Sequence, residues 1–371
     1  MRVCFDLRTA QKNSRYTGIG IYTYEVGRRL VQEDPDIFFL VRENCQLPFT
    51  IPGRRLIKVR SFNKPESLQE IIDPIITFRK LLNNKIDVFH SPVPGYIRSN
   101  SSFKLITTVH DVIPDIYPEE KHKPFFNALL YKKKNKYAST SNFIIFDSYC
   151  TQNDFIKFYG EPKKYSVVYL GAEQSNEFKR EVNFDFNFYG KYIFYIGGFN
   201  KRKNFDYLFR ILPEILAEHD LNFVIGGNIS NQDKNRIRDL CKSNDVDFRK
   251  VLYTGRLSPS ELSRFYKFSY FFIYPSMYEG FGLPIAEALN SECLVFSTNN
   301  SSIPEVGGES IIYITGSNPE TDTELIKNTL QNENLIKHLK NKAKSQRDLF
   351  SWDKTTKTTL EIYKKVYENT Y

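Results

Sequence analysis

The fold-deciding stretch is Tyr274-Pro-Ser-Met-Tyr-Glu-Gly-Phe-Gly-Leu-Pro-Ile-Ala-Glu-Ala-Leu289. It begins where the apolar run Phe271–Tyr274 ends, and that run has the length and aromatic content of a buried strand. A glycine-containing loop follows, and Pro284 stands where the first turn of a helix would begin. The stretch therefore predicts a strand, a loop and a helix in succession, which is the repeating unit of a parallel α/β sheet.

The same alternation of strands and helices runs through the whole chain in two series. The strand-like runs of the first series are Arg2–Asp6, Phe38–Val41, Asp87–His90, Leu105–Val109, Phe143–Phe146 and Ser166–Tyr169. Helix-like segments between them include Gly20–Val31, Glu66–Leu82, Lys121–Ala138 and Thr151–Tyr159. After a polar connector at Gly171–Gly190, the second series has strand-like runs at Tyr192–Ile196, Asn222–Ile225, Val251–Tyr253, Phe271–Tyr274, Leu294–Phe296 and Ile311–Ile314.

Two such series predict an α/β protein with two Rossmann-like, doubly wound parallel-sheet domains facing each other across a cleft. We expect the first domain at residues 1–170 and the second at 171–351. The amphipathic last segment, Trp352–Tyr367, has no strand after it, so residues 352–371 are predicted to pack back on the first domain. A capping box at Ser258-Pro-Ser-Glu261 marks one helix start. Ligands of open α/β sheets bind beyond the carboxyl ends of the strands, so the chemistry is expected just after each strand.

Composition narrows the classes of partner. The 371 residues carry a net charge of +9, and 15% of them are aromatic, which suits nucleic acid, a membrane surface or a phosphorylated small molecule. An AT-rich genome would produce the same bias. The five cysteines form no C-x-x-C pair, which argues against a disulfide framework or a zinc site. No apolar run reaches the 18 or so residues that span a bilayer, so a soluble, cytoplasmic protein is expected.

The opening stretch also predicts an anion site. Backbone N–H groups at Gly282 and Leu283 would lie at the positive end of the helix dipole, which suits a diphosphate. Glu279 and Glu287 flank this point and would repel a phosphate, so we expect them to accept hydrogen bonds from sugar hydroxyls. The simpler alternative is that Glu287 complements the helix dipole and Glu279 caps the turn.

A second strand-to-loop stretch is basic: Tyr195-Ile-Gly-Gly-Phe-Asn-Lys-Arg-Lys-Asn204. Lys201, Arg202 and Lys203 would neutralise the negative charge that develops on a diphosphate leaving group. The alternative is a solvated basic turn. In the first half, Thr17-Gly-Ile-Gly20 precedes a helix and lets backbone approach an anion, and His110 ends a strand on the expected ligand side.

These stretches together resemble the retaining glycosyltransferases of family four, which have the GT-B fold. The resemblance rests on the E-x7-E spacing of Glu279 and Glu287 and covers essentially the whole chain. It implies that Glu279 contacts the donor sugar and that Glu287 binds the ribose hydroxyls. Lys203 matches the phosphate-binding lysine, and Gly198 stands where the family has an arginine.

The departure at Gly198 leaves Arg202 to supply the second cation, as in the R-K-N form of related members. His110 matches a histidine beside the donor sugar that supports an oxocarbenium-like transition state. Gly255-Arg-Leu257 resembles the loop that holds the nucleotide base. The implied catalytic residues are His110, Glu279, Lys203 and Arg202. The implied donor-binding residues are Gly18, Gly20, Gly198, Arg256, Leu257, Gly280, Phe281, Gly282, Leu283 and Glu287.

The resemblance predicts a retaining, metal-independent hexosyltransferase without a cofactor. Its leading donor is GDP-mannose, because the T-G-I-G-x-Y and V-H-D-V-I-P segments resemble bacterial polysaccharide mannosyltransferases. The expected acceptor is a saccharide or a polyprenyl-diphosphate-linked saccharide of O-antigen or capsule synthesis. A UDP-sugar or dTDP-rhamnose donor, a nucleotide-sugar epimerase, and a basic nucleic-acid-binding protein are the alternatives. Since no nucleic-acid motif is present, no nucleic-acid partner is expected.

Two further patterns bear on metals and membranes. The D-x-D triplets Asp34-Pro-Asp36 and Asp245-Val-Asp247 precede strands, away from the expected ligand side, so no metal site is predicted. Lys121–Tyr137 holds six lysines and no acidic residue, with apolar positions at helical spacing. It suits either an anionic membrane surface, at the inner face of the cell membrane, or an amphipathic core helix with a solvated face.

Overall fold

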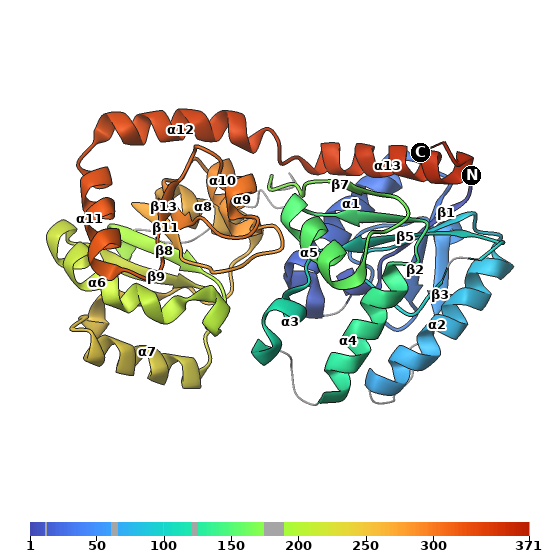
Figure 1. The fold of residues 1–371 in the computed structure, drawn as a ribbon, viewed down its shortest axis with the longest axis horizontal. Helices are drawn as coiled ribbons and strands as arrows, with labels where there is room; N and C mark the ends of the chain where they lie inside the picture. The colour runs from blue at the N-terminus through green and yellow to red at the C-terminus, as the bar shows by residue number, and fades with distance from the viewer. Residues whose placement is uncertain (12, 61–65, 99, 121–124, 174–188, 371) are drawn as a thin grey trace. The chain divides into compact units, whose positions relative to one another are not determined.

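The computed structural model divides the chain into two compact units. Unit 1 comprises Met1–Gly171 and Trp352–Tyr371, and unit 2 comprises Ala172–Ser351 (Figure 1). The structure describes residues 1–371 except 12, 61–65, 99, 121–124, 174–188 and 371. In each unit a parallel sheet forms the middle layer and helices lie on both sides of it (Figure 1).

Unit 1 has a seven-stranded parallel sheet in the order β3-β2-β1-β4-β5-β6-β7. Its strands are β1 (Val3–Asp6), β2 (Ile37–Arg42), β3 (Leu56–Val59), β4 (Val88–Ser91), β5 (Lys104–Val109), β6 (Phe143–Phe146) and β7 (Tyr165–Val167). Its helices are α1 (Gly18–Glu33), α2 (Glu66–Asn83), α3 (Ile113–Ile116), α4 (Phe125–Ala138), α5 (Tyr149–Tyr159) and α13 (Trp352–Glu368). The central strands are buried on both faces, as covered parallel sheets require.

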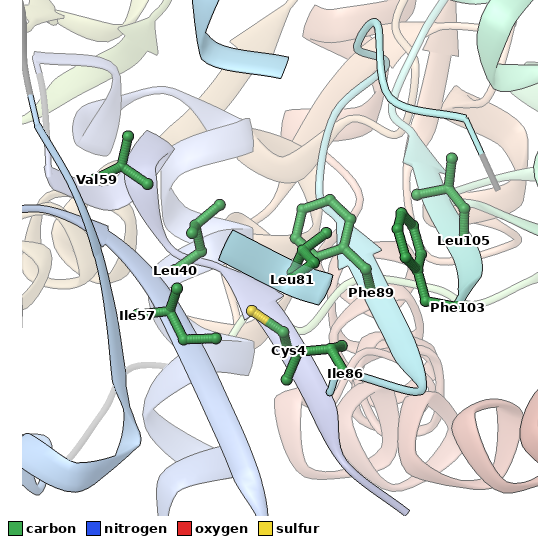
Figure 2. Close-up of a cluster of buried hydrophobic side chains, with 9 residues drawn as sticks. All are labelled: Cys4, Leu40, Ile57, Val59, Leu81, Ile86, Phe89, Phe103 and Leu105. Carbon is green, nitrogen blue, oxygen red and sulfur yellow. The ribbon is translucent and has the colours of Figure 1, made fainter. Parts of the chain in front are cut away.

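One hydrophobic cluster of unit 1 joins this sheet to α2 (Figure 2). Its buried members are Cys4, Leu40, Ile57, Val59, Leu81, Ile86, Phe89, Phe103 and Leu105. Ile57 and Val59 come from β3, a strand that the sequence analysis did not predict. Cys4 is 0% exposed within the cluster, so it acts there as a small apolar side chain.

Helix α13 belongs to unit 1 although it follows unit 2 in the chain. The hydroxyl of Tyr363 on α13 lies 2.7 Å from Nδ1 of His90 on β4, and both side chains are fully buried. A Cβ atom at Gly171 would overlap the backbone of Trp352, so only glycine fits where the start of α13 crosses the end of the first segment. These contacts make α13 an integral part of the unit.

Unit 2 has a six-stranded parallel sheet in the order β10-β9-β8-β11-β12-β13. Its strands are β8 (Tyr192–Ile196), β9 (Asn222–Gly226), β10 (Val251–Tyr253), β11 (Phe271–Tyr274), β12 (Val295–Thr298) and β13 (Ile312–Ile314). Its helices are α6 (Phe205–His219), α7 (Asn231–Ser243), α8 (Pro259–Phe268), α9 (Leu283–Asn290), α10 (Ile303–Gly307), α11 (Pro319–Leu330) and α12 (Glu333–Arg347). The predicted capping box of Ser258 and Glu261 is confirmed at the start of α8.

Aromatic side chains fill much of the core of unit 2. Phe194 on β8 stacks on Phe265 with ring centroids 5.5 Å apart, and the ring of Tyr266 meets Phe194 edge-on at 5.3 Å. Phe272 on β11 adds an edge-on contact with Tyr266 at 5.0 Å. Part of the aromatic excess therefore has a structural use in addition to any genomic bias.

Several sequence predictions fall on residues outside the described part. Residues 174–188 of the predicted connector and 121–124 of the basic segment lie there, as do the side chains of 125–129. In the described remainder of the basic segment, Lys132, Lys133 and Lys136 are exposed. Among the described helices, none combines the length and the apolar character needed to cross a membrane.

Candidate functional site

The reversal of strand order in unit 2 places two predicted site residues together. The chain runs outward from β8 through β9 to β10 and then returns to β11 on the other side of β8. Such a switch point is where open α/β sheets bind ligands, beyond the carboxyl ends of the strands. Lys203 follows β8 and Glu279 follows β11, so both lie at this point.

The carboxylate of Glu279 is the centre of a buried polar cluster. Its Oε1 accepts hydrogen bonds from Lys203 Nζ at 2.7 Å and from the Tyr274 hydroxyl at 2.9 Å. The Ser276 hydroxyl donates to the same oxygen at 2.5 Å, and Nη1 of Arg202 lies 3.4 Å from it. Glu279 is only 8% exposed, so these partners supply the interactions that water would otherwise provide.

The cations decide the ionisation of this carboxyl. Burial acts to raise the pKa of Glu279, but the nearby charges of Lys203 and then Arg202 outweigh it and hold the pKa below its ordinary value. Burial raises the pKa of Tyr274 well above its usual value, and the charge of Glu279 adds to this. The site therefore presents a carboxylate, two cations and a neutral phenol.

The basic turn after β8 is held from both sides. Lys201–Lys203 form a single 3₁₀ turn, which Asn200 caps by accepting a bond from the Lys203 N–H at 3.1 Å. The guanidinium of Arg202 donates to the carbonyl of Tyr278 at 2.5 Å. Lys201 is exposed, whereas Arg202 is buried, so the three adjacent cations have different environments. Of these three residues, only Lys201 fits the alternative interpretation of a solvated basic turn.

Gly198 lies in the loop before this turn. Its carbonyl accepts a bond from the Tyr195 hydroxyl at 2.7 Å. Among the described residues, a Cβ atom at Gly198 would have no neighbour within 4 Å. A side chain at this position would therefore meet no steric obstacle from them.

The glycine loop after β11 starts α9 as predicted. Gly282 precedes the helix with a φ of 97°, a left-handed conformation that favours glycine, and Pro284 lies in the first turn. Phe281 is buried and meets the ring of Phe350 edge-on at 5.6 Å. Gly280 and Phe281 thus lead directly into the positive end of α9, which begins at Leu283.

Glu287 has different surroundings from Glu279. It lies half-buried on α9, and the Tyr266 hydroxyl of α8 donates to its Oε2 at 3.1 Å. Burial raises the pKa of Glu287 to about 7, against the opposing effect of the Tyr266 hydrogen bond. The two glutamates of the E-x7-E spacing therefore differ, since cations lower the pKa of Glu279 whereas burial raises the pKa of Glu287.

Arg256 and Leu257 follow β10, two strands away from the switch point. Gly255 has a φ of 70°, and its carbonyl accepts a bond from the Gly227 N–H at 3.0 Å. Arg256 is exposed and Leu257 is half-buried. Arg256 and Leu257 lie at the same carboxyl edge of the sheet as Lys203 and Glu279. They are farther than those two residues from the point where the strand order reverses.

In unit 1, His110 follows β5 and is buried with both ring nitrogens in hydrogen bonds. Nδ1 lies 2.5 Å from Oδ2 of Asp147, which follows β6, and Nε2 lies 2.8 Å from the Pro92 carbonyl. Both partners are acceptors, so this geometry suits the doubly protonated imidazolium. Burial acts to lower the pKa of His110, but Asp147 outweighs it and raises the pKa above its ordinary value.

The predicted glycines of unit 1 lie in a helix. Gly18 and Gly20 are in the first turn of α1, which Thr17 caps by accepting from the Gly20 N–H at 3.4 Å. The helix thus begins at Gly18, two residues before the predicted start. Gly18 is exposed, and among the described residues nothing would lie within 4 Å of a Cβ atom at this position.

The D-x-D aspartates have local partners. Asp34 accepts a bond from the Asp36 N–H at 2.8 Å, and Asp247 pairs with Arg249 at 2.7 Å. In the part of the chain that the structure describes, no group of three or more histidine, cysteine or acidic side chains could hold a metal ion.

Three residues of these clusters were not singled out from the sequence. Ser276 and Tyr274 bond to Glu279, and Asp147 bonds to His110. Asp147 follows the predicted strand Phe143–Phe146. This position at the carboxyl edge of the sheet could have identified it from the sequence as a candidate site residue. Tyr274 ends an apolar strand and gave no signal of a polar role.

Comparison with known proteins finds two family models along the chain. Residues 16–175 match "Glycosyltransferase Family 4", and residues 179–346 match "Glycosyl transferases group 1". The chain is 26% identical over 204 residues to the uncharacterized glycosyltransferase MJ1607 of Methanocaldococcus jannaschii, covering 54% of this chain and 51% of that protein. It therefore spans about half the length of that relative.

Longer matches exist in sequence and in structure. O-antigen chain mannosyltransferase B of Escherichia coli is 23% identical, with 94% of this chain and 96% of that protein covered. Sucrose-phosphate synthase from Thermosynechococcus elongatus superimposes with a TM-score of 0.76 at 14% identity, over 100% of both chains. The fold is accordingly the predicted GT-B fold.

Proposed function

Because the chain belongs to the glycosyltransferases, with a Family 4 domain followed by a group 1 domain, we propose that it is a retaining hexosyltransferase. In this proposal it transfers mannose from GDP-mannose to a saccharide acceptor during synthesis of a cell-surface polysaccharide. The choice of mannose is supported by the similarity to mannosyltransferase B over 94% of this chain. O-antigen or capsule is the proposed product class.

The observation that carries the proposal is the buried contact of Lys203 and Arg202 with Glu279 at the switch point of unit 2. A nucleotide sugar needs cations beside its diphosphate and an acceptor of hydrogen bonds beside its sugar. This cluster offers both within one set of contacts. In this proposal Lys203 turns from Glu279 toward the diphosphate when a donor binds, and Glu279 then meets the sugar hydroxyls.

The proposed reaction balances without a protein nucleophile. The bond between the anomeric carbon and the diphosphate oxygen breaks, and the electron pair leaves with the phosphate. Lys203 and Arg202 stabilise the charge that develops there, because fixed cations in a water-poor site need little reorganisation. The acceptor hydroxyl oxygen bonds to the anomeric carbon on the same face, and its proton passes to the leaving phosphate oxygen. Configuration is thereby retained.

Other residues complete the donor site in this proposal. The N–H groups at Gly282 and Leu283, at the positive end of α9, bind the diphosphate with Gly280 and Phe281. Glu287 binds the ribose hydroxyls, and its half-buried position supports this role. The loop of Arg256 and Leu257 holds the base, and Gly198 leaves room beside the basic turn.

Unit 1 contributes the acceptor side. In this proposal His110 supports the oxocarbenium-like transition state, and the backbone at Gly18 and Gly20 binds the donor. A polyprenyl-diphosphate-linked saccharide is the proposed lipid form of the acceptor, reached at the inner face of the cell membrane. The exposed Lys132, Lys133 and Lys136 support contact with anionic headgroups, each contributing about 1 kcal/mol.

A thermal-shift screen tests the donor. We expect GDP-mannose and GDP to raise the unfolding temperature more than UDP-glucose, UDP or a dTDP sugar, since a ligand at 100 times its Kd adds roughly 2.7 kcal/mol. Turnover with a mannose-containing oligosaccharide then yields a product whose anomeric configuration is measured by NMR. An α-linked product from the α-linked donor supports retention, and an inverted product refutes it. A larger shift with a UDP or dTDP sugar would replace the mannose assignment.

A further inference from the structure

Two adjacent serines after β12 bond to the main chain of Glu279. The Glu279 N–H donates to Oγ of Ser301 at 2.8 Å. The hydroxyl of Ser302 donates to the Glu279 carbonyl at 3.0 Å. Both polar groups of this one residue's backbone are therefore held by side chains of a segment more than twenty positions away in the chain.

Ser301 holds a backbone conformation that serine rarely adopts. Its φ is 52°, in the left-handed region where non-glycine residues are uncommon. Such a conformation is strained and persists only where the surroundings determine it. This conformation places the Ser301 hydroxyl where it accepts the hydrogen bond from the Glu279 N–H.

Ser302 departs from the usual hydrogen bonding of a serine at a helix N-terminus. It occupies the N-cap position of α10, where a serine side chain normally accepts a bond from the first turn of its own helix. Its hydroxyl makes no such bond to α10, whose residues are all described. The side chain is fully buried, and its bond goes to Glu279 instead. Departures of this kind from the hydrogen bonding that the local sequence predicts occur mainly at functional sites.

We propose that Ser301 and Ser302 are positioning residues that fix Glu279 for sugar transfer. The inference rests on the proposed function, in which Glu279 contacts the donor sugar. The two serines hold the peptide groups of Glu279, while Ser276 and Tyr274 hold its carboxylate. When a donor diphosphate draws Lys203 away, the carboxylate keeps its place because the backbone behind it does not move.

The substitution Ser301→Gly separates positioning from stability. Glycine accepts the left-handed φ without strain, which offsets the loss of the hydrogen bond to the Glu279 N–H, so the unfolding temperature is expected to stay close to the wild-type value. The hydroxyl that receives the Glu279 N–H is lost, and a misplacement near the chemistry lowers kcat by about tenfold to a hundredfold. The affinity for GDP alone, measured by calorimetry, is expected to stay unchanged because Glu279 faces the sugar.

Ser302→Ala, with Ser269→Ala as its matched control, completes the test. Ser269 also donates a hydroxyl bond to a main-chain carbonyl, that of Tyr266 at 2.8 Å, but it precedes β11 at the opposite edge of the sheet. We expect Ser302→Ala to lower kcat as Ser301→Gly does, and Ser269→Ala to leave kcat unchanged.

The outcomes separate this inference from the proposed function. If Glu279→Ala and Lys203→Ala abolish transfer while Ser301→Gly and Ser302→Ala keep kcat near the wild-type value, the positioning role is overturned and the function stands. A loss of GDP affinity parallel to the loss of kcat in both serine variants also overturns it, since that indicates general damage. Near-normal turnover of Glu279→Ala would overturn the proposed function itself.

Discussion

Replacing Lys203 with methionine removes the nearest cation of Glu279 and keeps most of the side-chain volume. The Lys203 and Glu279 side chains are 15% and 10% exposed, and their charged atoms lie 2.7 Å apart. Removing one partner of a buried pair costs about 3–5 kcal/mol. Because Arg202 and two hydroxyls still face the carboxylate, we expect a loss at the low end of this range, about 3 kcal/mol.

The same substitution is expected to change activity and acid stability. Loss of one preorganised charge at the leaving group lowers kcat by about 10²–10³. Glu279 has a lowered pKa in the folded state, so it adds stability above its unfolded pKa, and that stability is lost as the pH falls through the folded pKa. Lys203→Met raises this folded pKa, so acid unfolding should begin at a higher pH.

A double-mutant cycle with Glu279→Gln measures the pair directly. Urea unfolding of the wild type, Lys203→Met, Glu279→Gln and the double variant gives four free energies of unfolding, and steady-state assays with GDP-mannose give four values of kcat. We expect the double variant to lose less stability than the sum of the single losses, by about 1–3 kcal/mol. Losses that add to within about 0.5 kcal/mol, or turnover of Lys203→Met close to the wild-type value, would refute the reasoning.

Three further predictions follow from the described contacts. Burial raises the pKa of Glu287 to about 7, so its contribution to stability is present below its unfolded pKa and lost as the pH rises through 7. Glu287→Gln should therefore flatten the pH dependence of urea unfolding between pH 5 and 8, and an unchanged slope would contradict this. Ser258→Ala breaks the capping box of α8 and should cost about 1 kcal/mol with unchanged kcat; a large loss of kcat would show a role beyond capping. EDTA should leave turnover unchanged because cationic side chains face the leaving group, and strong inhibition would revive the D-x-D triplets as metal ligands.

Alternating strands and helices predicted the fold well because their patterns are local. The predicted run Tyr192–Ile196 coincides with β8, and Phe271–Tyr274 coincides with β11. Strand β3 was missed because it is short, lies at the edge beside β2, and carries the exposed Lys58 in its apolar run. The hydrophobic pattern therefore predicts strand boundaries well for strands that are buried on both faces. It predicts them poorly for a strand at the edge of the sheet.

Site residues were predictable one at a time, but their contacts were not. Glu279 and Lys203 were each expected to face the donor, on different parts of it. Their contact arises because β8 and β11 are neighbours in the sheet although two strands separate them in the chain. Ser301 and Ser302 gave no signal, since two serines in a polar loop suggest only a turn. Their role depends on a φ and a cap that the tertiary structure imposes.

The placement of α13 in unit 1 sets an order for synthesis on the ribosome. Domains generally fold as units, with the N-terminal one first. Here residues 172–351 leave the ribosome as one continuous unit, whereas unit 1 waits for Trp352 and Tyr363 before His90 acquires its buried partner. Unit 2 can therefore finish folding first, although its synthesis starts later. Until α13 is made, the first segment leaves uncovered the apolar surface that Trp352 and Tyr363 bury in the finished unit.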